Sequence, residues 1–400
     1  MPLNVVMIGS KGCGKTSTLA VMLHDVEQFI NTLTANNPLF QETDKLPEIS
    51  SGGMSASRLM DAYGQLRNLV ADAKKHPDDI NMIAGEIIGD ETSNVNQIKF
   101  VLGDVSDTIQ FWDFPGGFFS RKQIEKGRFQ NDRKTWEKRI EDADIILLSV
   151  DASYQLQPRG RLKYDESYYE RIMELIKKSI SNNQNPQSRK MLVFMPVKCE
   201  HMVLDASYDS EDKVIDLSFD EHKSAGLQSQ VVDLFPGLLD FCKKRTNSVD
   251  VFFVPMITVG GIKCNRIKLD DSDFENSGLK ATVGFGPILP EHHRVTPFKP
   301  MNCDRVFALC LWKMLNSLAQ QWATNHKFKS FFSWFFDNPV QIFFEKLLMS
   351  IGMGRMWGNY MLRRIDDEPD LTPEDRQSLK KYLEDLIKES PATAGCSWLS

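Results

Sequence analysis

The chain has 400 residues, of which 42% are hydrophobic and 26% charged, a balance typical of a globular protein with roughly two to three domains' worth of core. The formal net charge of -6 at pH 7 argues against a surface built to neutralise nucleic-acid phosphates, so we expect no nucleic-acid partner. Seven scattered cysteines without a CxxC pair, and no run of about 18 apolar residues, predict a cytoplasmic protein with reduced thiols and no transmembrane segment.

Strand-like apolar runs alternate with helical patterns along the first 325 residues. The predicted strands cover residues 3–8, 97–102, 108–112, 144–150, 190–195 and 249–255. The predicted helices, with apolar residues three and four apart, cover residues 16–33, 132–142, 164–181 and 222–244. This alternation is typical of a parallel sheet with crossover helices. We therefore predict a three-layer α/β fold with a mostly parallel central sheet, followed by a helical C-terminal extension.

The turn after the first predicted strand carries a phosphate-binding motif. Residues 9–16, GSKGCGKT, fit the pattern G-x-x-x-x-G-K-[ST] between a strand and a helix. Glycines let backbone N–H groups converge on a β-phosphate, while Lys15 supplies charge to the β- and γ-phosphates and Thr16 supplies a hydroxyl ligand for Mg²⁺. The predicted nucleotide-binding residues of this loop are Gly9, Gly12, Cys13, Gly14, Lys15, Thr16 and Ser17.

A second nucleotide signal follows at the end of the third predicted strand. The sequence DFPG, residues 113–116, lies where open α/β sheets bind ligands. Asp113 would reach Mg²⁺ through water, so Thr16 and Asp113 are the predicted metal ligands, and the Gly116 N–H would sense the γ-phosphate. This pair resembles the switch of Ras-like and translation-factor-related P-loop GTPases.

Further stretches in chain order extend the resemblance to the translation-factor-related GTPases over residues 1–325. They are "VVMIGSKGCGKTSTLAVML", "FWDFPGG", "IILLSVDAS" and "PFKPMNCDRVFALCLWKML", and the last is similar to the bacterial double-GTPase families of conflict systems. The resemblance implies a switch hydroxyl at Thr92, with Ser93 as the alternative, that closes on Mg²⁺ and the γ-phosphate. The implied catalytic residues are Lys15, Thr92 and Gly116.

The same resemblance implies guanine recognition in "VKCE", after the fifth predicted strand. The Lys198 stem would lie on the base, and the Glu200 carboxylate would accept from guanine N1–H and the 2-amino group. Val197 stands where these GTPases carry a polar residue that ties this loop to the phosphate loop. Gly117 stands where Ras-like enzymes carry the glutamine that orients the attacking water, which predicts slow hydrolysis.

The predicted function is therefore an Mg²⁺-dependent switch that binds GTP and GDP, hydrolyses GTP slowly and controls a partner protein. The double-GTPase resemblance implies a role in bacterial defence or stress signalling. Two alternatives stay open: an ATP-binding ATPase or kinase, and a scaffold that binds nucleotide without hydrolysing it.

We expect a nucleotide-binding domain at residues 1–325, with insertions at about 36–96 and 262–296. The first insertion has a helical pattern at residues 55–75 in the switch I region, either a nucleotide-dependent element or a packed lid, and the second has the composition of a solvated loop.

The remaining residues divide into an aromatic-rich helical extension at 326–392 and a flexible tail at 393–400. The aromatic density of residues 327–365 allows three readings: packing onto the domain, an interface with a protein partner or second copy, or peripheral contact with a membrane.

Overall fold

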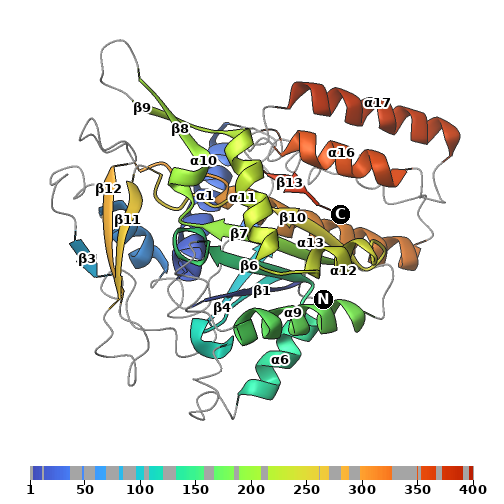
Figure 1. Cartoon of the computed structure of the whole chain (residues 1–400). Coiled ribbons are helices and arrows are strands. Elements are labelled where there is room, and N and C mark those ends of the chain that lie inside the picture. The colour runs from blue at the N-terminus through green and yellow to red at the C-terminus, as the bar shows by residue number, and fades with distance from the viewer. Residues whose placement is uncertain are drawn as a thin grey trace.

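In the computed structural model the chain folds around an eight-stranded sheet (Figure 1). The structure describes residues 3–10, 13–36, 47–48, 59–68, 81–83, 96–102, 108–119, 132–156, 166–183, 189–208, 215–260, 262–269, 281–287, 298–326, 349, 353–365, 372–390 and 396–399.

The sheet contains all six predicted strands and two short edge strands. In chain order its strands are β1 (Leu3–Gly9), β2 (Pro47–Glu48), β4 (Asn96–Leu102), β5 (Thr108–Asp113), β6 (Ile145–Asp151), β7 (Lys190–Val197), β10 (Val249–Phe253) and β13 (Ser397–Trp398). Their order across the sheet is β13-β10-β7-β6-β1-β5-β4-β2. The five strands from β10 to β5 are parallel, and the other three pair antiparallel at the edges. The predicted α/β class and mostly parallel sheet are confirmed.

The order of the strands reverses at β1. After β1 the chain forms β4 and β5 on one side of it, and then crosses to form β6 and β7 on the other. Ligands of open α/β sheets bind at the carboxyl ends of the strands where the order reverses. This topology places the predicted phosphate-binding loop, which follows β1, at the switch point.

Helices cover both faces of the sheet, so the fold has three layers. One face is covered by α1 (Lys15–Asn36), α13 (Cys303–His326), α16 (Gly354–Arg364) and α17 (Pro373–Glu389), and the other by α6 (Arg133–Asp142), α9 (Glu166–Ser181), α11 (Glu221–Asp233) and α12 (Leu238–Lys243). Along β1, Val5 and Met7 point to the α1 face and Val6 and Ile8 to the α6 face, as strand alternation requires. In Figure 1 the red helices α16 and α17 lie above the sheet and the green helices α6 and α9 below it.

The single helix predicted at residues 222–244 is wrong, because the structure divides it into α11 and α12. Between them, Pro236 has no N–H to donate and Gly237 adopts a left-handed φ of 73°. Leucine, valine and cysteine side chains keep the three- and four-residue spacing through the break, which explains the prediction of one helix.

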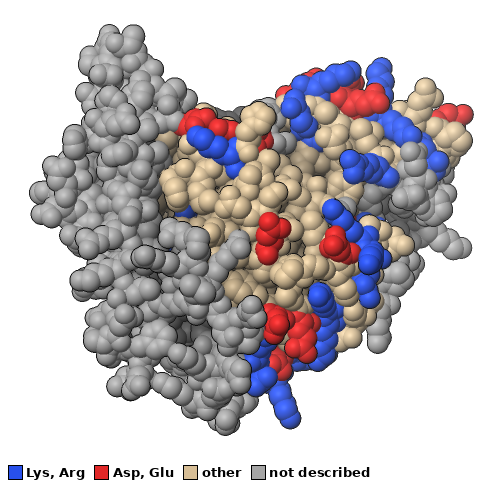
Figure 2. Space-filling view, viewed as in Figure 1, with Lys and Arg blue, Asp and Glu red and all other residues tan. Residues whose placement is uncertain are grey.

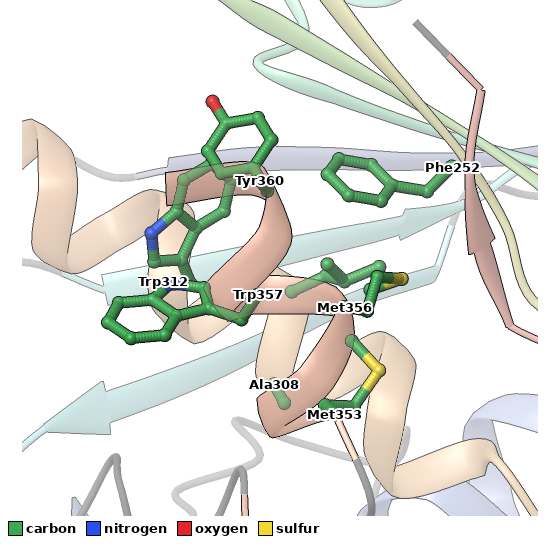
Figure 3. A pocket seen from close by; sticks show the side chains of 8 residues that line it. Phe252, Ala308, Trp312, Met353, Met356, Trp357 and Tyr360 are labelled. Carbon is green, nitrogen blue, oxygen red and sulfur yellow. The ribbon is translucent and has the colours of Figure 1, made fainter. Parts of the chain in front are cut away.

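The described part of the C-terminal extension packs against the α1 face. Figure 3 shows a small apolar pocket where side chains of α16, α13 and β10 meet. Tyr360 is 1% exposed, lies edge-on to Trp312 with ring centroids 4.9 Å apart, and donates a hydrogen bond to Asp250 Oδ2 at 3.1 Å. The apolar side chains of residues 353–365 in the predicted aromatic segment therefore belong to the core, and residues 327–348 lie outside the described residues.

The tail expected to be flexible contains the edge strand β13 at Ser397–Trp398, so the prediction is wrong for its described residues. In β13, Ser397 and Trp398 pair antiparallel with Phe253 and Phe252 of β10. The Trp398 ring lies edge-on to Tyr360, with centroids 5.1 Å apart. Backbone pairing at the open edge of β10 and this aromatic contact together explain why such a short segment is ordered.

The two insertions form a small sheet together. Its strands are β3 (Asn81–Ile83) from the first insertion and β11 (Ile262–Leu269) and β12 (Ala281–Pro287) from the second, in the order β11-β12-β3. A hairpin of β8 (Leu204–Tyr208) and β9 (Ile215–Phe219) follows β7. The solvated loop expected across the second insertion is therefore wrong for β11 and β12, and the acidic run 270–280 lies outside the described residues.

The helix predicted in the first insertion is present at residues 59–68 and packs on α1. Leu59, Ala62 and Leu66 are each 5% exposed. Tyr63 stacks on His24 of α1, with ring centroids 3.7 Å apart and planes 12° apart. These contacts support the reading of this helix as a packed lid.

Next to this stacked pair, Asp25 makes the fold sensitive to pH. Burial and the neighbouring Asp304 raise the pKa of Asp25 to about 7, so the folded chain favours the neutral form. Ionisation of Asp25 lowers the free energy of unfolding. This loss is absent below the ordinary pKa of about 4 and is fully present above pH 7. Since 28% of the side chain is exposed, we expect Asp25→Asn to raise the free energy of unfolding by only about 2 kcal/mol at pH 8, and by almost nothing near pH 4.

Urea unfolding at the two pH values measures this effect. The control is Asp61→Asn, a change of the same kind on the exposed side of helix 59–68, which should alter neither value. An Asp25→Asn protein less stable than the wild type at pH 8 would contradict the prediction.

Charges of both signs lie side by side on the described part of the face in Figure 2. Over α6 the pairs are Arg133–Glu137 and Lys138–Asp142, at 2.9 and 2.8 Å. Among the residues described, no helix combines the length and the hydrophobicity needed to cross a bilayer.

Candidate nucleotide-binding site

The backbone of the loop between β1 and α1 requires glycine at two positions, Gly9 and Gly14. Gly14 adopts a left-handed φ of 98°, which side chains other than glycine rarely adopt. A Cβ on Gly9 would lie 2.6 Å from the carbonyl oxygen of Ser149 on β6, so only glycine lets the end of β1 lie this close to its neighbour. Gly12 lies outside the described residues, and Cys13 is fully buried beneath the loop.

Lys15 keeps its ammonium group inside the loop. Its Nζ donates to the carbonyl oxygens of Ser10 at 3.0 Å and Gly9 at 3.3 Å, and the residue is only 7% exposed. A buried cation satisfied by two neutral carbonyls gains stronger, charge-assisted hydrogen bonds when anionic oxygens replace them. The position of Lys15 therefore suits a phosphate group.

The two predicted metal ligands lie in direct contact, although they are far apart in the sequence. Thr16, in the first turn of α1, donates from Oγ1 to Oδ2 of Asp113 at 2.9 Å. Asp113, the last residue of β5, is 1% exposed. A hydroxyl and a carboxylate are hard oxygen ligands of the kind that Mg²⁺ prefers beside phosphates, so this pair fits that ion.

Four buried hydroxyls surround the loop without a hydrogen-bond partner among the described residues: Ser10, Ser17, Thr18 and Ser149. A buried hydroxyl left unpaired costs free energy, which an anionic ligand or water would recover. The sequence predicted only Ser17 among them. Ser149 could have been predicted from the pairing of β6 with β1, because that pairing places it directly beside Gly9.

After Asp113 the chain is anchored in the core. Gly116 opens a short 3-10 helix, Gly116–Phe119, whose aromatic residues Phe118 and Phe119 are each 1% exposed. Phe118 lies 5.3 Å from Trp136 of α6, measured between ring centroids. The position after Gly116 is glycine, so no side chain there can orient a water molecule.

On the other side of β1, Lys198 follows β7 with a left-handed φ of 56°. Its Nζ donates to Oδ2 of Asp151, the last residue of β6, at 2.7 Å. Neighbouring strands lie about 4.8 Å apart, so the end of β7 is roughly 10 Å from the end of β1.

Glu200 opens the short helix α10 (Glu200–Val203) and is 3% exposed. Its carboxylate accepts hydrogen bonds from its own backbone N–H and from the backbone N–H groups of Thr258 and Val259, which follow β10. Oε1 is enclosed and has no hydrogen-bond partner in the part of the chain that the structure describes. Burial is the main cause that raises the pKa of Glu200 to about 7, and Lys198 acts in the opposite direction.

The structure thus brings the predicted residues together in two groups at one edge of the sheet. Lys15, Thr16 and Asp113 form the first group, and Lys198 and Glu200 form the second, two strands away. The predicted switch hydroxyl Thr92 and its alternative Ser93 lie outside the described residues.

No protein-family model matches the chain, and no curated protein matches it. Similar solved structures include the GTPase-like domain of Ski7 from S. cerevisiae, bound to GTP in one crystal structure and to GDP and inorganic phosphate in another. Both are 16% identical to this chain and cover 64% of it, with TM-scores of 0.32 and 0.30. The chain spans 43% of the length of these structures. Similarity of this extent does not place the chain in a family, so its function has to follow from the residues of the site itself.

Proposed function

We propose that the protein is a guanine-nucleotide-binding switch that requires Mg²⁺ and hydrolyses GTP slowly. The observation that carries the proposal is the hydrogen bond from Thr16 to Asp113 beside the buried Lys15, at the switch point of the sheet. A hydroxyl, a carboxylate and an ammonium group that converge on a glycine-rich loop form the set that phosphate chains with a divalent ion require.

Guanine is the favoured base because of Glu200. Backbone N–H groups of Glu200 itself, Thr258 and Val259 donate to its carboxylate, while Oε1 lacks a partner among the described residues. Guanine offers two adjacent donors, N1–H and the 2-amino group, whereas adenine offers an acceptor at N1. Oε1 is covered by other atoms of the protein, and a base can reach it only if those atoms move. We therefore expect binding to rearrange the loop after β7.

In the proposed mechanism Lys15 exchanges its two carbonyl acceptors for β- and γ-phosphate oxygens. Mg²⁺, held by Thr16 and through water by Asp113, would supply positive charge to the same oxygens. The Gly116 N–H would report the presence of the γ-phosphate. Since Gly117 has no side chain to orient water, intrinsic hydrolysis is expected to be slow.

Titration calorimetry of the purified full chain with non-hydrolysable GTP and ATP analogues in Mg²⁺ tests the proposal. We expect the GTP analogue to bind at least about tenfold more tightly than the ATP analogue, and EDTA to weaken its binding. Equal or tighter binding of the ATP analogue would overturn the guanine assignment and favour the ATPase or kinase alternative.

The second candidate is a scaffold that binds nucleotide without hydrolysing it, and the glycine at position 117 followed by the buried Phe118 and Phe119 favours it. Single-turnover hydrolysis separates the two, because the switch must release phosphate and the scaffold must not.

The proposed output is control of a partner protein, and the resemblance to double-GTPase families supports defence or stress signalling as the process. We propose the interface with a protein partner or second copy for the segment 327–365, apart from the side chains of residues 353–365 that pack into this chain.

A further inference from the structure

The loop after β7 lacks the polar tie that the sequence led us to look for. Val197, the last residue of β7, is 1% exposed and packs in the core on the α1 face. An apolar buried side chain cannot hydrogen-bond to the phosphate loop. Something else therefore has to hold the following residue, Lys198, in place.

Lys198 is held through both its backbone and its ammonium group. Its left-handed φ of 56° is uncommon for a residue with a side chain and persists only when the surroundings enforce it. The Nζ to Oδ2 distance of 2.7 Å to Asp151 is that of a charge-assisted hydrogen bond. Asp151 pairs directly with Val197 across β6 and β7, so the two strands bring the ion pair together.

Asp151 is in turn fixed by its own neighbours. Its second oxygen, Oδ1, accepts from Ser153 Oγ at 2.7 Å, and its backbone N–H donates to Gln155 Oε1 at 2.7 Å. Gln155 also donates to the hydroxyl of Tyr169 at 3.3 Å. Asp151, Ser153 and Gln155 are 6%, 3% and 1% exposed, so solvent cannot replace these partners easily.

We propose that Asp151 is a positioning residue for nucleotide binding, which holds Lys198 so that its stem can lie on the base. The inference rests on the proposed function and adds to it: in this chain the base-recognition loop is fixed to β6 by an ion pair. The short segment after β6, Ala152–Gln155, then belongs to the support of the site.

A double-mutant cycle on the full chain tests the inference. The variants are Asp151→Asn, Lys198→Met and the two combined, and calorimetry measures their affinities for GDP, ADP and inorganic pyrophosphate. We expect Asp151→Asn to weaken GDP binding roughly tenfold and to leave pyrophosphate binding unchanged, because pyrophosphate contacts only the phosphate loop. In the Lys198→Met background, Asp151→Asn should cause no further loss, since the group it positions is absent.

The matched control is Glu141→Gln, which removes the negative charge that lies 2.6 Å from the Lys178 ammonium on the α6 face and should not change GDP affinity. If Asp151→Asn does not fold, Ser153→Ala removes one hydrogen bond to the same carboxylate and should weaken GDP binding by about threefold.

The outcomes separate the inference from the proposed function. A wild type that binds ADP as tightly as GDP overturns both. A wild type that prefers GDP, with additive losses in the cycle or an Asp151→Asn protein of unchanged GDP affinity, overturns the inference alone.

Discussion

Replacing Lys15 by alanine is expected to lower the affinity for GTP by more than about 100-fold and the affinity for GDP, which lacks the γ-phosphate, by about tenfold, while the weak affinity for GMP stays within about threefold of the wild type. The ammonium group is the only charge that the described part of the loop aims inward, and it donates to the carbonyls of Gly9 and Ser10 and, at 3.9 Å, to the sulfur of Cys13. Two charge-assisted hydrogen bonds to the β- and γ-phosphates contribute about 3 kcal/mol or more, which the alanine variant loses.

The affinity for GMP shows whether Lys15→Ala removes a phosphate contact or instead disrupts the structure of the loop. GMP carries only the α-phosphate, which backbone N–H groups of the loop would bind, so its affinity reports whether the loop still forms. Calorimetry in Mg²⁺ gives the three affinities, and circular dichroism confirms the fold. Lys178→Ala, at an exposed ammonium of α9, provides the control for removing a lysine.

A Lys15→Ala protein that binds GTP within about threefold of the wild type would contradict the assignment of the loop. An equal loss for GMP and GTP would mean that the substitution unfolds the loop, and the role of Lys15 at the β- and γ-phosphates would then fail this test.

The sequence predicted those parts of the fold that have local signals. The core strands are short apolar runs that end at glycine or polar residues, and all six were found within about two residues of their bounds. The backbone of the loop after β1 was predictable because it depends on glycines at fixed positions, such as Gly9 and Gly14. The contact between Thr16 and Asp113 followed from topology, because α1 begins just after β1, and β1 and β5 are adjacent parallel strands whose carboxyl ends lie at one edge of the sheet.

Other features depend on pairing between distant segments and have no local signal. Met82 pairs with Val283 across the small sheet, from insertions about two hundred residues apart, and neither segment shows a clear strand pattern alone. Ser397 and Trp398 form a strand because β10 has an unpaired edge with which they can form hydrogen bonds. Asp151 lies in the segment IILLSVDAS, but nothing in that segment indicates Lys198 as its partner, and only the register of β6 and β7 places the two side chains together.

Glu200→Gln is expected to abolish the preference for GTP over ATP and, at the same time, to stabilise the nucleotide-free protein at pH 8. The loss of a carboxylate that accepts two hydrogen bonds from guanine corresponds to about 100-fold in GTP affinity, with little change for ATP. Gln keeps an oxygen that can accept from the N–H groups of Thr258 and Val259, so the variant keeps the hydrogen bonds between position 200 and the residues after β10.

The gain in stability follows from the burial that raises the pKa of Glu200 to about 7. The folded protein favours the neutral form, so ionisation of Glu200 lowers the free energy of unfolding. This loss is absent below about pH 4.5, grows toward pH 7 and is constant above it. At pH 8 this loss is about 2–3 kcal/mol, and Gln does not incur it. Differential scanning calorimetry should show a rise of a few degrees in Tm at pH 8 and none near pH 4.5.

The same pKa predicts that the preference for GTP over ATP increases about tenfold from pH 6 to pH 8 in the wild type, as Glu200 becomes able to ionise. Phosphate titration affects both nucleotides alike, so the ratio isolates the base. Burial also raises the pKa of the neighbouring Cys199 and Cys303 well above their usual range, so these thiols stay neutral over this interval. Glu384→Gln, an exposed substitution on α17, should leave both the ratio and the Tm unchanged. If Glu200→Gln keeps the wild-type ratio at pH 8, Glu200 does not read the base, and the choice between guanine and adenine must lie with other residues.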